Sequence, residues 1–448
     1  MPAPAAAPAV REPPATVWGA LRHVGPGLIL SAAIVGSGEL IATTALGARA
    51  GFSLLWMILL GCTVKVAVQL EYGRAAILHG RPTLQAWNLG QRAGGGLHWS
   101  VHLAALFMLV NMAGQGGVIG GAAEVGRYLW PFPGLAGWLL GLALLVGLLA
   151  GSGRYQPVEW TATALNAVFL AGVFGCLFAL QGTELAIRGR DLGEGLRFHL
   201  PEGNWSLALA AFGLTGIASG EITLYPYWCL EKGYARWTGP REDTAAWRAR
   251  ARGWMRVMTV DALLSMLLYT LATCGFYLLG ATVLHARGEL QDGPALVVQL
   301  SAMFTEVLGP GVRWVFMVCA LAVLFSTIFA NSAGFSRMWA DYFGLRGWLD
   351  WGEETRRRRT VAVAAWVFPL LAAGCYLGVG KPLLLVVLMG ITNALYLAVV
   401  GWQTLRFRYL LSPPAMRPSR LYDLALWISL LAIGAMVALA VHNLLGQL

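Results

Sequence analysis

Two carboxylates lie where the chain should be most apolar. A Ser-Gly-Glu tripeptide at 37–39 interrupts the apolar stretch 25–56, and a second one at 219–221 interrupts the stretch 212–227. Glycine is unfavourable inside a helix, and a charged carboxylate is costly inside a bilayer. Because both features recur together, we expect two interrupted helices with an anionic site between them. Paired interruptions of this kind indicate the substrate site of a membrane transporter.

The chemistry of this pair favours a cation. Glu39 and Glu221, together with backbone carbonyls freed by unwound helix, would form an all-oxygen site. Such a site suits Mg²⁺, Ca²⁺ or Mn²⁺ better than Fe²⁺, Zn²⁺ or Cu²⁺. A carboxylate pair also suits an organic cation or amine. Alternatively, the glutamates cap the amides of the resumed half-helices, and no ion site exists.

The predicted substrate or ion site comprises Gly36, Ser37, Gly38, Glu39, Ile217, Ser219, Gly220, Glu221 and Thr223, with Glu39 and Glu221 as hypothetical metal ligands. Further polar and aromatic residues that could line the cavity are Gln115, Tyr225, Tyr227, Thr392 and Asn393. Glycine at Gly36 and Gly220 would leave room for a hydrated ion or a larger solute. A divalent cation here would be cargo, and we expect no cofactor.

Lys65 is the one basic residue that we expect to be buried deep inside a predicted span. We expect it to pair with a carboxylate, and Glu39 is the candidate across the helix interface. Such a pair would neutralise part of the site and argue against a divalent ion. A fixed cation could instead replace a coupling sodium ion or proton. The structural alternative is that the long side chain extends to the membrane interface.

The composition indicates a polytopic α-helical membrane protein. Of the 448 residues, 57% are hydrophobic and only 12% are charged, against about 25% charged in soluble proteins. The net charge of +10 does not indicate nucleic-acid binding, because the basic residues lie in short loops. The six cysteines stand singly in apolar segments, without metal-ligand or disulfide spacing. The lipid bilayer and a small ion or solute are therefore the expected partners.

About eleven apolar segments are long enough to span a bilayer. They lie at about 24–48, 51–79, 98–129, 133–151, 157–181, 205–231, 255–281, 310–342, 360–379, 382–405 and 421–446. A shorter helix near 294–307 should lie outside the bilayer, and residues 1–20 should form a disordered tail. The sequence shows no signal peptide, catalytic triad or nucleotide-binding motif, so we expect no enzyme.

Lysine and arginine predict the orientation. Most of the 32 basic residues fall in segments that face the cytoplasm if the N-terminus is cytoplasmic and the C-terminus is outside. The densest clusters lie at 236–256 and 356–359, and both would be cytoplasmic. We interpret these clusters as topology signals and anchors at the lipid surface. The expected location is the plasma (inner) membrane.

Two motifs connect the chain to a known family. A Gly-Pro-Gly at 25–27 begins the first interrupted stretch, which aligns without a gap over 25–56 with the first span of the Nramp family of divalent-metal transporters. The GxxG at 213–216 and the Leu-Tyr at 224–225 resemble that family's sixth span. The resemblance covers about residues 20–405. It implies the LeuT-like inverted-repeat fold of five plus five helices, first seen in sodium-coupled amino-acid transporters.

The fold class we expect is therefore an all-α polytopic membrane protein with about eleven transmembrane helices, of which the first and sixth are broken. The repeats would occupy residues 21–203 and 204–408, and residues 409–448 would add an eleventh helix. Five spans per repeat is an odd number, so the second copy enters the membrane from the opposite side.

The residues that hold metal in the resembling family are mostly absent. The positions of its metal-binding Asp and Asn are occupied by Gly36 and Glu39. The positions of its Met and His are occupied by Gly220 and Ile222, so the soft thioether ligand is missing. Its acidic pair on the third span, which resembles a proton relay, falls on Gly114 and Gly117.

These features predict a secondary transporter that works by alternating access, most readily of Mg²⁺ or Mn²⁺, without the proton coupling of the resembling family. The first alternative is the same fold with a non-metal substrate, such as an organic cation, an amino acid or another small solute. The second is a membrane protein on this fold that transports nothing. The sequence leaves the oligomeric state open.

Overall fold

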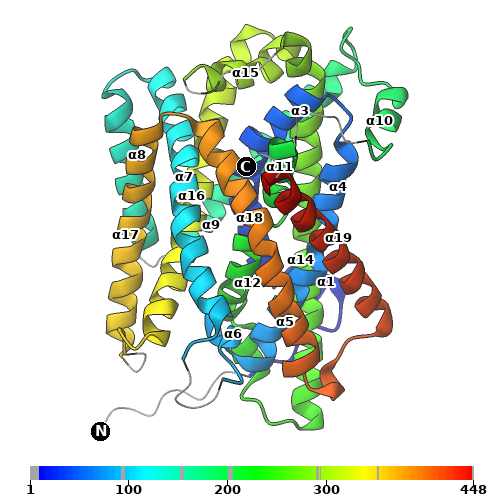
Figure 1. Cartoon of the computed structure of the whole chain (residues 1–448), viewed down its shortest axis with the longest axis vertical. Helices are drawn as coiled ribbons and strands as arrows, with labels where there is room; N and C mark the ends of the chain where they lie inside the picture. Colours follow the sequence, from blue (N-terminus) through cyan, green and yellow to red (C-terminus); the bar gives the residue numbers. More distant parts are fainter. Residues whose placement is uncertain are drawn as a thin grey trace.

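The computed structural model describes residues 10–91, 96–151, 156–199, 205–288, 292, 294–350 and 353–445. This part of the chain is helical throughout and contains no β-strand. Nine of its helices are long and apolar enough to cross a membrane, judged by length and composition. Most of the long helices run along the longest axis of the molecule (Figure 1).

The helices of the first half are α1 (Val17–Leu21), α2 (Pro26–Ile34), the π-helix η1 (Val35–Thr43), α3 (Thr44–Ala50), α4 (Leu55–Val64), α5 (Val66–His79), α6 (Thr83–Trp87), α7 (Trp99–Leu129), α8 (Gly134–Gly151), α9 (Gln156–Leu180) and α10 (Gly189–Gly195).

The helices of the second half are α11 (Trp205–Leu214), α12 (Ser219–Lys232), α13 (Tyr234–Thr238), α14 (Ala245–Leu279), η2 (Gly280–Leu284), η3 (His285–Arg287), α15 (Pro294–Leu308), η4 (Pro310–Val312), α16 (Arg313–Leu345), α17 (Glu354–Val379), α18 (Pro382–Leu405), η5 (Arg406–Leu411), η6 (Pro414–Met416) and α19 (Arg420–Leu445).

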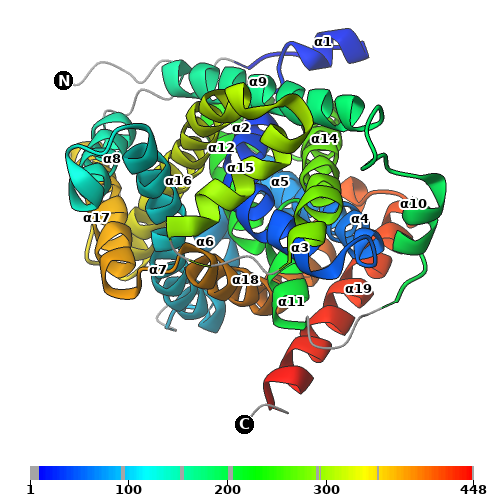
Figure 2. The same cartoon turned by 90° about the horizontal axis from the view of Figure 1, so that it is seen from above.

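Each predicted span corresponds to a helical segment. The first predicted span is α2, η1 and α3, the second is α4 with α5, and the sixth is α11 with α12. The short helix expected near 294–307 is α15, which lies across one end of the molecule (Figures 1 and 2). The predicted start of the seventh span, at about 255, is wrong by ten residues, because α14 begins at Ala245. The helix starts there because the side chain of Thr244 accepts a hydrogen bond from the Trp247 amide at 3.1 Å.

Two groups of helices can be distinguished by their packing. In the first, α7 lies against α16, α17 and α18, and α8 packs on α17. In the second, α14 contacts α2, α4 and α5, and α12 contacts α2 and α5. The last helix, α19, lies at the periphery beside α18 and α5 (Figure 2).

Glycines bring α7 close to its neighbours. A Cβ added at Gly120 would lie 2.1 Å from the ring of Tyr376 on α17, and one at Gly116 would lie 2.8 Å from the carbonyl oxygen of Ala372. Small residues allow this close approach, which is a main source of helix association in membranes. The two interrupted segments lie between these packed helices, so the predicted site is in the interior.

Candidate functional site

The first Ser-Gly-Glu tripeptide lies in a π-helix. The α-helix α2 ends at Ile34, and the next nine residues, Val35–Thr43, form η1 before α3 resumes at Thr44. The predicted interruption is therefore present, but it is a widened turn and not an unwound segment. Its carbonyls are largely bonded, as shown by that of Glu39, which accepts from the amide of Thr44 and from its hydroxyl at 3.0 Å. Single π-helical turns occur frequently at functional sites.

Glu39 projects from η1 into the interior and is fully buried. Its Oε1 lies 2.8 Å from the hydroxyl of Thr273 on α14, and that hydroxyl also lies 2.7 Å from the Tyr269 carbonyl oxygen. Its second oxygen, Oε2, has no hydrogen-bond partner in the described part of the chain. One hydroxyl hydrogen cannot serve two acceptors at once. The geometry thus fits an ionised Glu39 that accepts from Thr273, or a protonated Glu39 that donates to it.

The second stretch contains an unwound break. Residues 215–218 separate α11 from α12, and Gly216 adopts a φ of +61°. A Cβ at Gly216 would also lie 2.7 Å from the Cα of Cys62, so only glycine fits there. The predicted break is therefore confirmed, but it lies just before the Ser-Gly-Glu tripeptide, which forms the first turn of α12. Ile217 is buried within the break.

Asn393 of α18 caps the start of α12. Its Oδ1 accepts from the Ser219 hydroxyl at 2.9 Å and from the Gly220 amide at 3.1 Å. The hydroxyl of Thr223 donates back to the Gly220 carbonyl oxygen at 2.7 Å. The structure therefore brings Ser219, Gly220, Thr223 and Asn393 together at the start of α12. Thr392 points elsewhere and bonds the Leu388 carbonyl oxygen of its own helix.

Glu221 lies in the first turn of α12 and is partly exposed. Among the described residues its carboxylate has no hydrogen bond or ion pair. The positive end of the helix dipole stabilises a carboxylate at this position. The charges of Glu221 and Lys65 both act on Glu39, with opposite effects.

Lys65 is fully buried, but the structure shows no ion pair between it and Glu39. Its Nζ donates to the carbonyl oxygens of Phe212 and Thr215, both at 2.7 Å, and lies 5.0 Å from the centre of the Phe212 ring. These carbonyls stand at the C-terminal end of α11, the negative end of its dipole. The ammonium group therefore binds two backbone carbonyl oxygens at the break. From the sequence, we expected such carbonyls to coordinate a transported ion.

The expected room at Gly36 and Gly220 is absent. A Cβ at Gly36 would lie 1.8 Å from the hydroxyl oxygen of Thr327, and one at Gly220 would lie 3.2 Å from the Phe335 ring and 3.4 Å from the Phe107 ring. The Thr327 hydroxyl donates to the carbonyl oxygen of Ala33 at 3.0 Å, so α16 is bonded directly to α2. Neighbouring helices fill the volume that larger side chains would need.

The two glycines of α7 that replace the acidic pair of the resembling family are also packed. A Cβ at Gly114 would lie 2.4 Å from the Cβ of Met389, and one at Gly117 would lie 2.5 Å from the Pro382 carbonyl oxygen. Both contacts are with α18. This part of α7 therefore serves close helix packing and offers no proton-carrying side chain.

The remaining predicted lining residues are divided between the site and its surroundings. Gln115 is buried, with its Nε2 3.5 Å from the Met389 sulfur and its Oε1 without a partner. Tyr225 donates to Asp261 at 3.1 Å, and Tyr227 donates to Asp341 at 2.7 Å. The two tyrosines therefore connect helices around the site. Gly38 packs against the end of α11, where an added Cβ would lie 3.3 Å from the carbonyl oxygen of Leu214. The Ser37 side chain lies outside the described residues.

Asp261 of α14 caps the start of α2. Its carboxylate oxygens accept from the amides of Gly25 at 2.7 Å and Gly27 at 2.6 Å. The Gly-Pro-Gly start of α2 has no side chain of its own that could cap these amides. This buried carboxylate joins α2, α12 and α14 through three hydrogen bonds, counting that from Tyr225.

A second set of contacts joins α12 to α16 at the end of the molecule near α6. Arg337 forms a bidentate ion pair with Glu231 and stacks 5.0 Å from the centre of the Trp228 ring. Asp341, fully buried, accepts from Tyr227 and from Gln85 of α6 at 2.9 Å. These contacts hold the half-helix after the break against α16 in this conformation.

Comparison with known proteins places the chain in a family. Residues 27–446 match the family described as natural resistance-associated macrophage protein-like, Nramp. The chain belongs to the Nramp-like family. A curated relative, the divalent metal cation transporter MntH of Mycobacterium tuberculosis, is 26% identical over 344 residues, which cover 76% of this chain and 73% of the relative.

Solved structures show that this Nramp-like chain has the inverted-repeat transporter fold. The Eremococcus coleocola manganese transporter aligns with a TM-score of 0.67 and 16% identity, covering 96% of this chain and 88% of that one. The nucleobase-cation-symport-1 transporter Mhp1 in a closed conformation, with bromovinylhydantoin bound, gives 0.59 and 16%, covering 93% and 89%. MhsT in complex with L-phenylalanine gives 0.54 and 16%, covering 96% and 100%.

The two acidic side chains of this family member offer oxygen donors. In the described part of the chain, no group of three or more His, Cys, Asp and Glu side chains could hold a metal ion. The side chains available at the site are the free Oε2 of Glu39 and the carboxylate of Glu221. A cation held here would complete its coordination with backbone carbonyls, hydroxyls or water.

Proposed function

We propose that this chain is a secondary transporter that carries a hard divalent cation, Mn²⁺ or Mg²⁺, across the plasma membrane by alternating access. The observation that carries the proposal is the pair of carboxylates on η1 and α12: among the described residues, Glu39 keeps one buried oxygen without a hydrogen-bond partner, and Glu221 has no partner for its carboxylate. An ionised group in such a place is expensive unless it serves a substrate or a proton. The MntH relative is named a divalent metal cation transporter, which supports the same cargo.

Oxygen donors at the break support a hard ion over a soft one. Among the described residues, no group of three or more His, Cys, Asp and Glu side chains could hold a metal ion beside either glutamate. Carboxylate and carbonyl oxygens suit Mg²⁺ and Mn²⁺, and Mg²⁺ keeps several of its waters when bound. The tight packing at Gly36 and Gly220 leaves less space than the sequence suggested, which favours an ion over a bulky hydrate.

We also propose that the membrane potential, and not a proton gradient, drives the movement. The α7 positions that would carry a family-type proton relay are Gly114 and Gly117, and both are packed against α18. Two positive charges moving inward along a potential of 100 mV gain about 4.6 kcal/mol, which is enough to concentrate the ion strongly. The proposed orientation, with a cytoplasmic N-terminus and an outward C-terminus, follows from the distribution of lysine and arginine.

A second candidate cargo is an organic cation or another small solute. The specific observation in its favour is Lys65, whose buried ammonium already occupies two carbonyls at the break and reduces the negative charge of the site. Phe107 and Phe335 also approach Gly220, and aromatic faces can stabilise organic cations. The structural neighbours Mhp1 and MhsT were solved with a hydantoin and with L-phenylalanine.

Uptake into proteoliposomes tests the proposal. The purified protein would be reconstituted, an inside-negative potential imposed, and the entry of Mn²⁺ and Mg²⁺ measured with an internal fluorescent indicator. We expect uptake that grows with the potential, does not require a pH gradient, and falls at least tenfold in Glu39→Gln and in Glu221→Gln. Glu124→Gln, which alters a buried carboxylate of α7 outside the site, should keep most of the uptake.

Two results would redirect the assignment. Absence of uptake of both ions by folded protein would remove the metal and leave the organic solute as the cargo to be screened. Uptake that requires an inward proton gradient would show that the family's type of coupling survives without its relay residues.

A further inference from the structure

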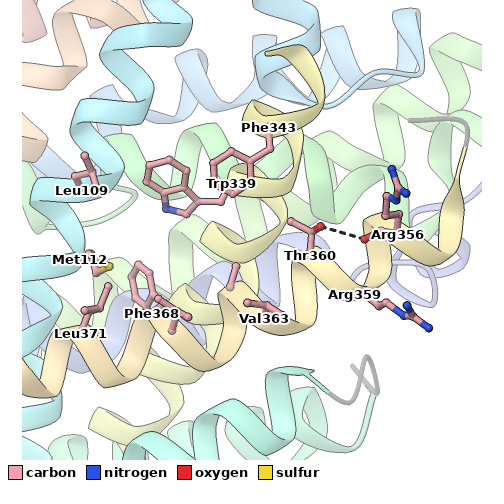
Figure 3. Close-up of a pocket in the computed structure, with 12 residues that line it drawn as sticks. Leu109, Met112, Trp339, Phe343, Arg356, Arg359, Thr360, Val363, Phe368 and Leu371 are labelled. Carbon is pink, nitrogen blue, oxygen red and sulfur yellow. Dashed lines mark hydrogen bonds between the residues drawn. The ribbon is translucent and has the colours of Figure 1, made fainter. Parts of the chain in front are cut away.

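A pocket lies among the helices that pack around α7, away from the break between α11 and α12. It has a volume of about 490 Å³ and is formed by α7, α16 and α17 (Figure 3). The residues that line it are Leu109, Met112, Trp339, Phe343, Arg356, Arg359, Thr360, Val363, Ala364, Val367, Phe368 and Leu371. Apart from the two arginines and Thr360, every lining side chain is apolar, and we call this pocket the α16–α17 groove.

The charged residues stand at one end of the groove. Arg356 and Arg359 lie on the first turns of α17, while Phe368 and Leu371 lie further along the same helix (Figure 3). Arg359 has no ion pair among the described residues, and Arg356 pairs only with its neighbour Glu353, at 3.0 Å. The two guanidinium groups point in different directions in Figure 3, so both long side chains would have to turn toward an anion at the mouth of the groove.

Aromatic residues mark the depth of that end in the membrane. Trp339 and Phe343 line the groove, with ring centres 5.5 Å apart, and Trp348 follows 5.7 Å from Phe343. Tryptophan and neighbouring aromatic residues gather at the level of the lipid headgroups. The apolar walls extend from there toward the hydrocarbon core, where Val363, Val367 and Leu371 are exposed to the surroundings.

We propose that the α16–α17 groove binds an anionic phospholipid of the cytoplasmic leaflet. An acyl chain would lie along the apolar wall of α17, and the phosphate would meet Arg356 and Arg359. Arginine binds phosphate through paired hydrogen bonds, and basic pockets between membrane helices on the cytoplasmic side recognise anionic headgroups. A lipid matches both ends of the groove, whereas a soluble phosphate would use only the arginines.

The groove lies on the far face of a helix that contacts the break. Trp339 and Phe343 face the groove, whereas Arg337 and Asp341 of the same α16 contact α12. Residues two positions apart on a helix point in nearly opposite directions. A bound lipid would therefore contact one face of α16, while the opposite face of α16 contacts α12.

The test compares lipids and variants by thermal unfolding of the purified full-length chain. Protein in a neutral detergent would receive phosphatidylglycerol or, separately, phosphatidylcholine of the same acyl chains. We expect phosphatidylglycerol to raise the unfolding midpoint with increasing concentration, and phosphatidylcholine to raise it far less. Arg356→Gln with Arg359→Gln should lose most of that difference, and so should Ala364→Phe, which fills the groove without changing charge.

Arg358→Gln is the matched control, because Arg358 lies on the same helix and carries the same charge but does not line the groove. It should keep the difference between the two lipids. Equal loss in Arg358→Gln, or full retention in Ala364→Phe, would overturn the proposal in favour of general attraction to the basic surface. An equal effect of glycerol phosphate, which has no acyl chain, would identify a phosphate site and likewise overturn it.

Discussion

Glu39 and Thr273 form a buried pair of side chains at the first interruption. The carboxylate is fully buried, one oxygen contacts the Thr273 hydroxyl at 2.8 Å, and the other is free. Because Thr273 can also donate to the Tyr269 carbonyl oxygen, the pair stays bonded whether or not Glu39 carries a proton. The residue can thus change its charge without losing its position, which suits a site that fills and empties.

Replacing Thr273 with valine tests this support. Thr273→Val keeps the shape of the side chain and leaves Glu39 with two buried oxygens that have no partner. Loss of such a partner costs about 1–3 kcal/mol. We expect the free energy of unfolding, measured by denaturant titration in detergent, to fall by about that amount.

The matched control for Thr273→Val is Thr259→Val on the same helix. The Thr259 hydroxyl bonds only the Met255 carbonyl oxygen of its own helix, at 2.8 Å. Its loss should therefore change stability by less than about 0.5 kcal/mol. Equal effects of the two substitutions would show that Thr273 does nothing special for Glu39.

Single residues differ in how well the sequence reveals them. Glu39, Glu221 and Lys65 could be identified from the sequence because charge is rare and costly within an apolar span. Thr273 and Thr327 could not, since a threonine hydroxyl in a membrane helix usually bonds its own backbone and leaves no pattern. The partner of Lys65 was also hidden, because backbone carbonyls have no signature in the sequence.

At the scale of elements, the sequence predicted both interruptions but not their form. Glycine permits a π-helical turn, a kink or an unwound segment, and contacts with other helices decide among them. Gly216 has a positive φ and Cys62 approaches it closely, so only glycine fits there, and the second break occupies the four residues 215–218 directly before Ser219–Glu221. The first segment stays helical, with Thr327 of α16 pressed against Gly36.

The contact between α16 and η1 gives a prediction for Gly36→Ala. The new methyl group would lie within 1.8 Å of the Thr327 hydroxyl oxygen and 2.9 Å of the Val323 carbonyl oxygen. Overpacking of this kind costs about 1–3 kcal/mol, which exceeds the roughly 1 kcal/mol that alanine gains over glycine in a helix. Denaturant titration should show net destabilisation.

Gly121→Ala provides the comparison for Gly36→Ala. A Cβ at Gly121 meets nothing closer than 3.4 Å, from the Ile41 side chain, so the helix preference should make this variant equal to or more stable than the parent. If Gly36→Ala were more stable than the parent, space would exist beside η1, as the sequence-based expectation of a wider cavity requires.

The α12–α16 contacts should control how often the half-helix after the break moves away. Arg337→Gln removes the ion pair with Glu231 and the stacking on Trp228, each worth up to about 1 kcal/mol. We expect amide hydrogen exchange in α12 and α13 to accelerate roughly tenfold. The control is Arg346→Gln, which removes a cation that stacks on Trp348 at the end of α16 and should leave the exchange in α12 and α13 unchanged. If Arg346→Gln also accelerated that exchange, the effect would reflect general destabilisation of α16.

For the whole molecule, the composition and the length of the apolar segments were sufficient to predict an all-helical membrane protein. The resemblance over two short motifs supplied the family and its inverted-repeat fold, and the family match over residues 27–446 confirmed it. The repeat boundaries at 203–204 and 408–409 and the orientation of the termini stay predictions. Packing of the glycine-rich faces could not be predicted, because a glycine looks the same in sequence whether it opens a cavity or admits a neighbour.

The central claim is that Glu39 and Glu221 bind one divalent cation between η1 and α12. Titration calorimetry of the purified protein with Mn²⁺, and then with Mg²⁺, tests it most directly. We expect about one site per chain, with at least tenfold weaker binding in Glu39→Gln and in Glu221→Gln and unchanged binding in Glu124→Gln. Binding that survives unchanged when both glutamates are replaced would contradict it.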